Sequence, residues 1–332
     1  MRPSSKRAWA ISVSFLLLLS ISLSEFVSAQ QNPPPPPPVS QNQGRIRANV
    51  DLVVLHTSVL DQRGHVVTDL PKNAFRVFEN KVEQELSLFR REDIPVTVGL
   101  VIDNSGSMRE KREKVNSAAL TFVKTSNPAD EVFVVNFNDD YYLDLEKDFT
   151  NNIDELKEAL ERIDSRGSTA LYDAVIGSLD HAKKGSRDKK VLLVVSDGED
   201  TASRGGSKQA LQRAMLEAQK SEAVIYAIGL LGTEKKSEAR RAREALRQMT
   251  AATGGQAFFP ETLEDVEPIC TQIAHDIRNQ YTLAYYPTNA ARDGSFRAVQ
   301  VQLNPPKGRS KMTVRHKPGY YAPKDSAVSG GK

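Results

Sequence analysis

The chain has 332 residues, 26% of them charged and 39% hydrophobic, which is the composition of a globular protein with room for more than one domain. Its formal net charge is only +3, and three basic residues lie within its first seven positions. This balance gives no reason to expect a nucleic acid or an anionic membrane as the main partner, because both attract strongly basic surfaces.

The N-terminus has the pattern of a secretory signal. Arg2, Lys6 and Arg7 precede an uncharged apolar run at residues 8–23, and small residues follow at Val27-Ser28-Ala29. The run is short for a membrane span of roughly 20 residues. We therefore predict a cleavable signal peptide at residues 1–29, cut after Ala29, and an exported protein, periplasmic or extracellular. A signal retained as an anchor is the alternative, and no other segment is long and apolar enough to span a membrane.

Residues 30–44 form a predicted linker, because their six consecutive prolines favour an extended polyproline II spacer. Residues 45–93 then alternate apolar and polar side chains in short runs separated by turn signals. Phe75-Arg76-Val77-Phe78 is one such run, and Asp61-Gln62-Arg63-Gly64 is one such turn. This segment is predicted to form several short antiparallel strands.

Residues 94–278 have a different pattern, with apolar strands alternating with amphipathic helices. The predicted strands are 96–102, 132–137, 191–196, 224–230 and 256–259. The predicted helices are 109–124, 152–163, 170–183, 207–220, 238–253 and 263–278. Continuous apolar strands between helices imply a parallel sheet covered on both faces. The predicted fold is therefore an α/β domain with a doubly wound, mostly parallel sheet.

Residues 279–323 return to short β runs, and residues 324–332 form a polar tail that we expect to be disordered. The two β segments flank the α/β domain in sequence. We expect them to form one small accessory β module, because a parallel sheet brings its chain ends within reach of each other.

Polar side chains follow two of the apolar strands. Asp103-Asn104-Ser105-Gly106-Ser107 follows the first strand of the domain, and Asp197 follows the strand at 191–196. Thr169 lies between them in sequence, just before a helix. In an open parallel sheet, ligands bind beyond the carboxyl ends of the strands. We therefore expect the three loops to meet at one edge of the sheet.

The oxygen atoms of these side chains suit a hard cation. Asp103 and Asp197 supply carboxylates, and the hydroxyls come from Ser105, Ser107 and Thr169. With few carboxylates and several hydroxyls, such a site retains water, which suits Mg²⁺ or Mn²⁺ better than Ca²⁺. No histidine or cysteine is placed to make a zinc site.

This set resembles the metal-ion-dependent adhesion site of von Willebrand factor A domains, written Asp-x-Ser-x-Ser, then Thr, then Asp. The resemblance implies a Rossmann-like A domain in which these five residues hold the metal directly or through water. It also implies that an Asp or Glu of a partner protein completes the metal shell.

The flanking segments are similar to those of bacterial secreted proteins labelled as von Willebrand factor A-related. Two phrases carry this similarity, Phe75 to Glu79 and Gly319-Tyr320-Tyr321. One departure is Asn80-Lys81, where a glycine is expected in the turn.

The function predicted from these features is metal-dependent protein binding or adhesion, without enzymatic activity. A metal-independent scaffold of an envelope assembly is one alternative. A Mg²⁺-dependent phosphoryl-transfer enzyme is another, but such sites use a second aspartate at the position that Ser105 occupies.

Overall fold

The computed structural model describes residues 52–325, apart from 92, 163, 233–234, 305–307 and 309–310. The predicted signal peptide and linker lie outside these residues, as do residues 326–332 of the expected tail. The first two tail residues are held in place: Lys324 bridges to Asp293, and Asp325 accepts a hydrogen bond from Arg292.

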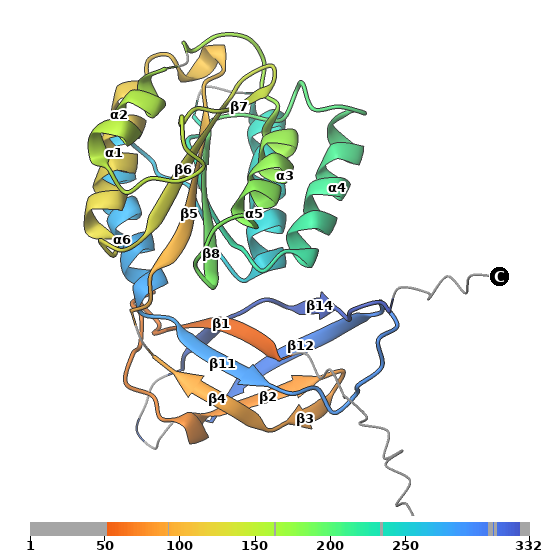
Figure 1. Cartoon of the computed structure of the whole chain (residues 1–332). Coiled ribbons are helices and arrows are strands. Elements are labelled where there is room, and N and C mark those ends of the chain that lie inside the picture. Colours follow the sequence, from red (N-terminus) through yellow and green to blue (C-terminus); the bar gives the residue numbers. More distant parts are fainter. Residues whose placement is uncertain are drawn as a thin grey trace, which may run out of the picture. The chain divides into compact units, whose positions relative to one another are not determined.

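Residues 96–258 build a six-stranded sheet in the order β10-β9-β8-β5-β6-β7 (Figure 1). The strands are β5 (Val96–Asp103), β6 (Glu131–Phe137), β7 (Tyr141–Leu143), β8 (Lys189–Ser196), β9 (Val224–Gly229) and β10 (Ala257–Phe258). All pairings are parallel except that of β7 with β6. All eight residues of β5 are buried, which explains why its apolar run is nearly unbroken.

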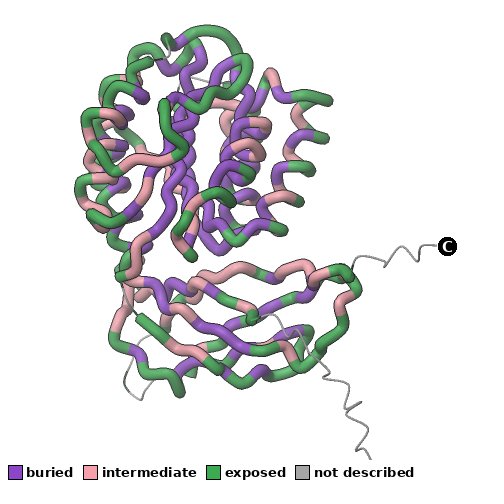
Figure 2. Tube along the Cα trace, in the orientation of Figure 1, coloured by how far each residue is buried: buried purple, intermediate pink, exposed green. Residues whose placement is uncertain are grey.

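Helices α1 to α6 cover the two faces of this sheet, as Figure 1 shows. One face packs against α1 (Arg112–Thr125), α2 (Ile153–Glu161) and α6 (Val266–Arg278). The other packs against α3 (Leu171–Ala182), α4 (Ser207–Lys220) and α5 (Lys236–Thr253). The strands are buried between the two layers, whereas the outer faces of the helices are exposed (Figure 2). This arrangement confirms the predicted doubly wound α/β fold.

Helix α1 begins three residues later than its sequence pattern predicts. A short 3-10 helix, Gly106–Met108, follows β5, and the amide of Lys111 then donates to the carbonyl of Met108 over 2.9 Å. These tight turns carry the chain from the strand end into the helix. The residues after Asp103 are therefore held in a compact loop.

The two flanking β segments form one module, as expected. Its first sheet has the order β13-β1-β11-β4 and its second β14-β12-β2-β3. The first segment contributes β1 (Val53–Leu60), β2 (Phe75–Glu79), β3 (Val82–Gln84) and β4 (Leu86–Arg90). The second contributes β11 (Tyr281–Tyr285), β12 (Phe296–Leu303), β13 (Thr313–Arg315) and β14 (Gly319–Tyr321). Each sheet therefore mixes strands from both ends of the chain around a shared apolar core.

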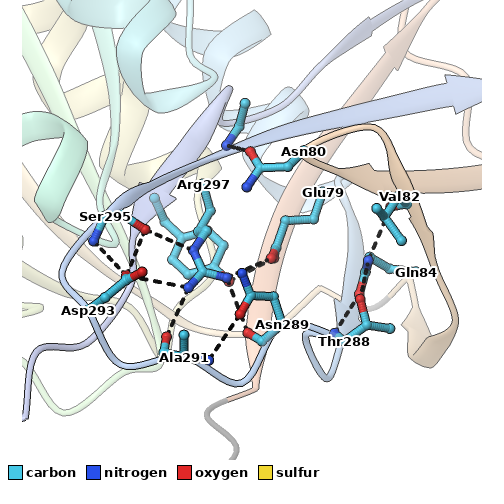
Figure 3. A network of polar contacts seen from close by, with 12 residues as sticks. Glu79, Asn80, Val82, Gln84, Thr288, Asn289, Ala291, Asp293, Ser295 and Arg297 are labelled. Carbon is cyan, nitrogen blue, oxygen red and sulfur yellow. Dashed lines mark hydrogen bonds and ion pairs between the residues drawn. The ribbon is translucent and has the colours of Figure 1, made fainter.

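A buried ion pair lies within this module (Figure 3). Arg297 of β12 is 1% exposed and donates to the Oε1 atom of Glu79 over 3.3 Å. Its other guanidinium bonds go to the carbonyls of Asn289 and Ala291 and to the side chains of Asp293 and Ser295. Because a buried guanidinium is costly unless its donors are satisfied, this network fixes the loop before β12.

Polar side chains also connect β9 and α6 to the β module. Tyr226 donates to Asp276 over 2.8 Å, and Gln280 donates to both Tyr226 and Ser58. Lys189, at the start of β8, donates to the carbonyl of Ile277 over 2.5 Å.

None of the helices in the described residues has the length and apolarity needed to cross a membrane.

Candidate metal site

The two aspartates of the predicted site lie at the ends of neighbouring strands. Asp103 is the last residue of β5, and Asp197 follows the last residue of β8, which pairs with β5. Both side chains are buried. The parallel sheet therefore delivers two carboxylates to the same edge, at the carboxyl ends of its central strands.

The serines connect these carboxylates. The amide of Ser105 donates to Asp103 Oδ1 over 2.8 Å, and the hydroxyls of Ser105 and Ser107 lie 3.2 Å apart. The Ser107 hydroxyl then donates to Asp197 Oδ1 over 2.8 Å. Four of the five predicted residues thus form one chain of polar contacts, and Ser107 faces solvent.

Thr169 comes from the loop before α3 and, in the part of the chain that the structure describes, shares no hydrogen bond with the other four. Its loop adjoins theirs through a backbone bond from the Gly106 amide to the Gly167 carbonyl, over 3.2 Å. The backbone of Thr169 is fixed by bonds with Thr201. Its hydroxyl has no hydrogen-bond partner within the described residues, so its oxygen is available as a metal ligand.

Gly167 is the residue that this loop requires. Its φ angle is +74°, a conformation that side chains rarely adopt, and a Cβ atom there would meet the Asp139 carboxylate at 2.2 Å. Asp139 in turn accepts a bond from the amide of Ser168 over 2.8 Å. The position of Thr169 therefore depends on a glycine and an aspartate beside it.

Burial dominates the electrostatics of Asp103. It raises the pKa of this carboxyl to about 6, and the charge of Asp197 acts in the same direction. Hydrogen bonds from Ser196 and Ser105 oppose this rise. Two buried carboxylates at one edge are a region of negative charge that a cation would stabilise.

Two residues that bind these carboxylates were not predicted from the sequence. Ser196 donates to Asp103 Oδ2 over 2.6 Å, and Lys111 donates to Asp197 Oδ2 over 2.5 Å. A polar side chain at the end of the otherwise apolar strand β8 was a usable signal for Ser196. No such signal exists for Lys111, because basic residues are common in loops.

A second polar layer lies beneath the first loop. Asn104 donates to Asn136 over 2.7 Å, and Asn136 donates to Asp144 over 2.7 Å. All three side chains are buried. They hold the backbone after Asp103 against β6 and the segment after β7.

The donor set fits a hard cation that accepts hydroxyl and carboxylate ligands. Within the described residues, no group of three or more His, Cys, Asp and Glu side chains is arranged to hold a metal ion. A metal at this edge would thus depend on serine and threonine oxygens as well as on Asp103 and Asp197.

The sequence around this site is similar to that of known proteins. The family model of the von Willebrand factor type A domain matches residues 98–199. Uncharacterized protein sll0103 of a Synechocystis strain is 29% identical over 109 residues, which are 32% of this chain and 26% of that protein. The chain thus aligns with about a quarter of this relative's length.

Solved structures are similar at low identity. A von Willebrand factor type A protein from Catenulispora acidiphila is 14% identical with a TM-score of 0.48, covering 76% of this chain and 74% of its own. The PilB minor pilin from Streptococcus sanguinis is 13% identical with a TM-score of 0.48, covering 56% and 62%.

The matched residues include Asp103, Ser105, Ser107, Thr169 and Asp197, and they span β5 to β8. Over this region the chain matches the model of the von Willebrand factor type A domain family.

Proposed function

We propose that this protein is exported, binds one divalent cation at the edge formed by β5 and β8, and uses that cation to bind another protein. The ligands are Asp103 and Asp197 with the hydroxyls of Ser105, Ser107 and Thr169, and Mg²⁺ or Mn²⁺ is the metal. The observation that carries the proposal is the meeting of two buried carboxylates and two serine hydroxyls at a solvent-facing edge.

The chemistry of the ligands supports a binding role. A cation held largely by neutral hydroxyls keeps much of its charge available to an incoming anion. A carboxylate of a partner protein, from Asp or Glu, would then be a strong anchor because the ion pair forms away from bulk water. The five residues would hold the metal at an edge where Ser107 is exposed, so a partner could reach it.

Metal titration is the first test. Binding should raise the melting temperature, and the free energy of unfolding gains about 2.7 kcal/mol when the free metal reaches 100 times its dissociation constant. Asp103→Ala should remove this response. Asp140→Ala, which removes an exposed carboxylate from the neighbouring loop, is the matched control and should retain it.

Partner binding is the second test. The purified chain is used to capture proteins from the native envelope fraction, with Mg²⁺ or with EDTA. Capture that disappears in EDTA and in Asp103→Ala, but persists in Asp140→Ala, supports the proposal. Equal capture in EDTA, together with no thermal response to millimolar Mg²⁺ or Mn²⁺, contradicts it and favours a metal-independent scaffold.

Export has its own test. Expression of the full chain in a bacterial host, followed by fractionation and N-terminal sequencing, should yield a product that begins at Gln30. A product that starts at Met1 and stays in the cytoplasm contradicts this part of the proposal.

A further inference from the structure

The candidate metal site already contains a positive charge of its own. Lys111 places its ammonium 2.5 Å from Asp197 Oδ2, with 14% of the lysine side chain exposed and none of the aspartate side chain exposed. A second, longer bond of 3.4 Å joins the ammonium to the carbonyl of Leu230. The aspartate is therefore paired with a lysine from the same loop that supplies Ser105 and Ser107.

This pairing occupies the second oxygen of Asp197. Its first oxygen accepts the Ser107 hydroxyl, and both oxygens of Asp103 also accept hydrogen bonds. The ammonium thus provides one positive charge beside two buried carboxylates. It does so from the rim, at the end of a flexible four-carbon side chain that is partly exposed to solvent.

We infer that Lys111 is a built-in competitor of the divalent cation, which must displace the lysine ammonium from Asp197 in order to bind. The inference rests on the proposed metal site. A divalent cation and an ammonium at one carboxylate repel each other strongly where the surroundings are partly buried. The lysine therefore keeps the metal-free site stable and lowers its affinity for metal.

The same residue has two effects of opposite sign, and both are measurable. Without metal, Lys111 offsets the repulsion between Asp103 and Asp197 and satisfies a buried carboxylate oxygen. With metal, its charge opposes the bound cation. Removing the charge should lower the melting temperature of the metal-free protein and raise its affinity for metal. Simple loss of folding does not produce this combination.

The test compares Lys111→Met with Lys114→Met. Lys114 lies in the first turn of α1, the helix that begins directly after Lys111. It has no ion pair within the described residues, so its variant controls for the change in net charge. Melting temperature in EDTA and calorimetric titration with Mg²⁺ and Mn²⁺ are measured for both variants and for the unmodified protein. Lys111→Gln, which keeps a hydrogen-bond donor without the charge, provides a second variant if Lys111→Met folds poorly.

The expected result is a lower melting temperature in EDTA for Lys111→Met and metal binding at least about ten-fold tighter than in the unmodified protein. Lys114→Met should match the unmodified protein in both measurements. If the unmodified protein binds metal, and Lys111→Met and Lys111→Gln bind it with equal or weaker affinity, the inference about Lys111 is overturned while the proposed metal site stands. No metal binding in any of the proteins would overturn the proposed metal site and the competition with it.

Discussion

The hydroxyl of Tyr320 donates a hydrogen bond of 2.8 Å to the Oε2 atom of Glu79, across 241 positions of the sequence. Tyr285 donates to the same oxygen over 3.0 Å, and Arg297 binds the other oxygen of the carboxylate. The two flanking sequence motifs, which end in Glu79 and in Tyr320-Tyr321, therefore meet at the buried ion pair of Glu79 with Arg297. This contact joins the first β segment of the chain to the last.

We predict that Tyr320→Phe lowers the free energy of unfolding by about 1.5 kcal/mol or more, because a hydrogen bond to a buried charged group is lost. Urea denaturation monitored by circular dichroism measures the change. Tyr321→Phe is the matched control, since the Tyr321 hydroxyl has no hydrogen-bond partner within the described residues. The control should stay within about 0.5 kcal/mol of the unmodified protein. Equal losses in both variants would contradict a specific role for the Tyr320 hydroxyl.

The fold was predictable from the sequence because its strongest signals are local. The run at β5 is nearly unbroken in its apolar residues and is buried at every position, and helix α4 begins and ends where its pattern predicts. The Arg297–Glu79 pair was not predictable, because its partners are 218 positions apart and nothing local marks them as neighbours. Strand β7 is also difficult to predict, since its three residues are all exposed.

The site was predictable only in part, for a similar reason. Asp103, Ser105 and Ser107 lie in one loop, so their spacing alone indicates a shared function. Asp197 was expected nearby because parallel strands end at the same edge of a sheet. The pairing of Lys111 with Asp197 depends on the turn that carries the chain into α1, and no residue spacing marks that contact.

The turn between β2 and β3 offers a stabilising substitution. Asn80 and Lys81 have φ angles of +47° and +72°, a pair of positive values that favours glycine at the second position of a hairpin turn. Lys81→Gly should raise the free energy of unfolding by roughly 0.5–1 kcal/mol, because the strain on the side-chain-bearing residue is removed. Lys81→Ala removes the same charge but keeps a Cβ atom. A similar gain in the alanine variant would show that charge, not backbone conformation, is responsible.

Thr169 allows the metal site to be tested without disturbing the fold. Its hydroxyl has no hydrogen-bond partner within the described residues, so Thr169→Val should leave the melting temperature in EDTA nearly unchanged. The affinity for Mg²⁺ should fall about ten-fold or more, since a ligand oxygen is lost. Ser168→Ala removes a hydroxyl from the adjacent, exposed position and should bind metal normally. Unchanged affinity in Thr169→Val would exclude this hydroxyl from the site.

The buried ammonium of Lys189 makes the free energy of unfolding depend on pH in the alkaline range. Burial lowers the pKa of its ammonium from 10.5 to about 8, while the carboxylates of Asp276, Asp130 and Asp93 act in the opposite direction. Between these two pKa values the unfolded chain binds more protons than the folded one, so the free energy of unfolding rises as the pH increases from about 8 to about 10.5. Urea denaturation across this range should show the rise in the unmodified protein and a smaller rise in Lys189→Met, because burial also lowers the pKa of the Lys317 ammonium to about 8. Lys190→Met, at the next position of β8, should retain the full rise, because adjacent side chains of a strand point to opposite faces. A rise of the same size in Lys189→Met would mean that another group is responsible.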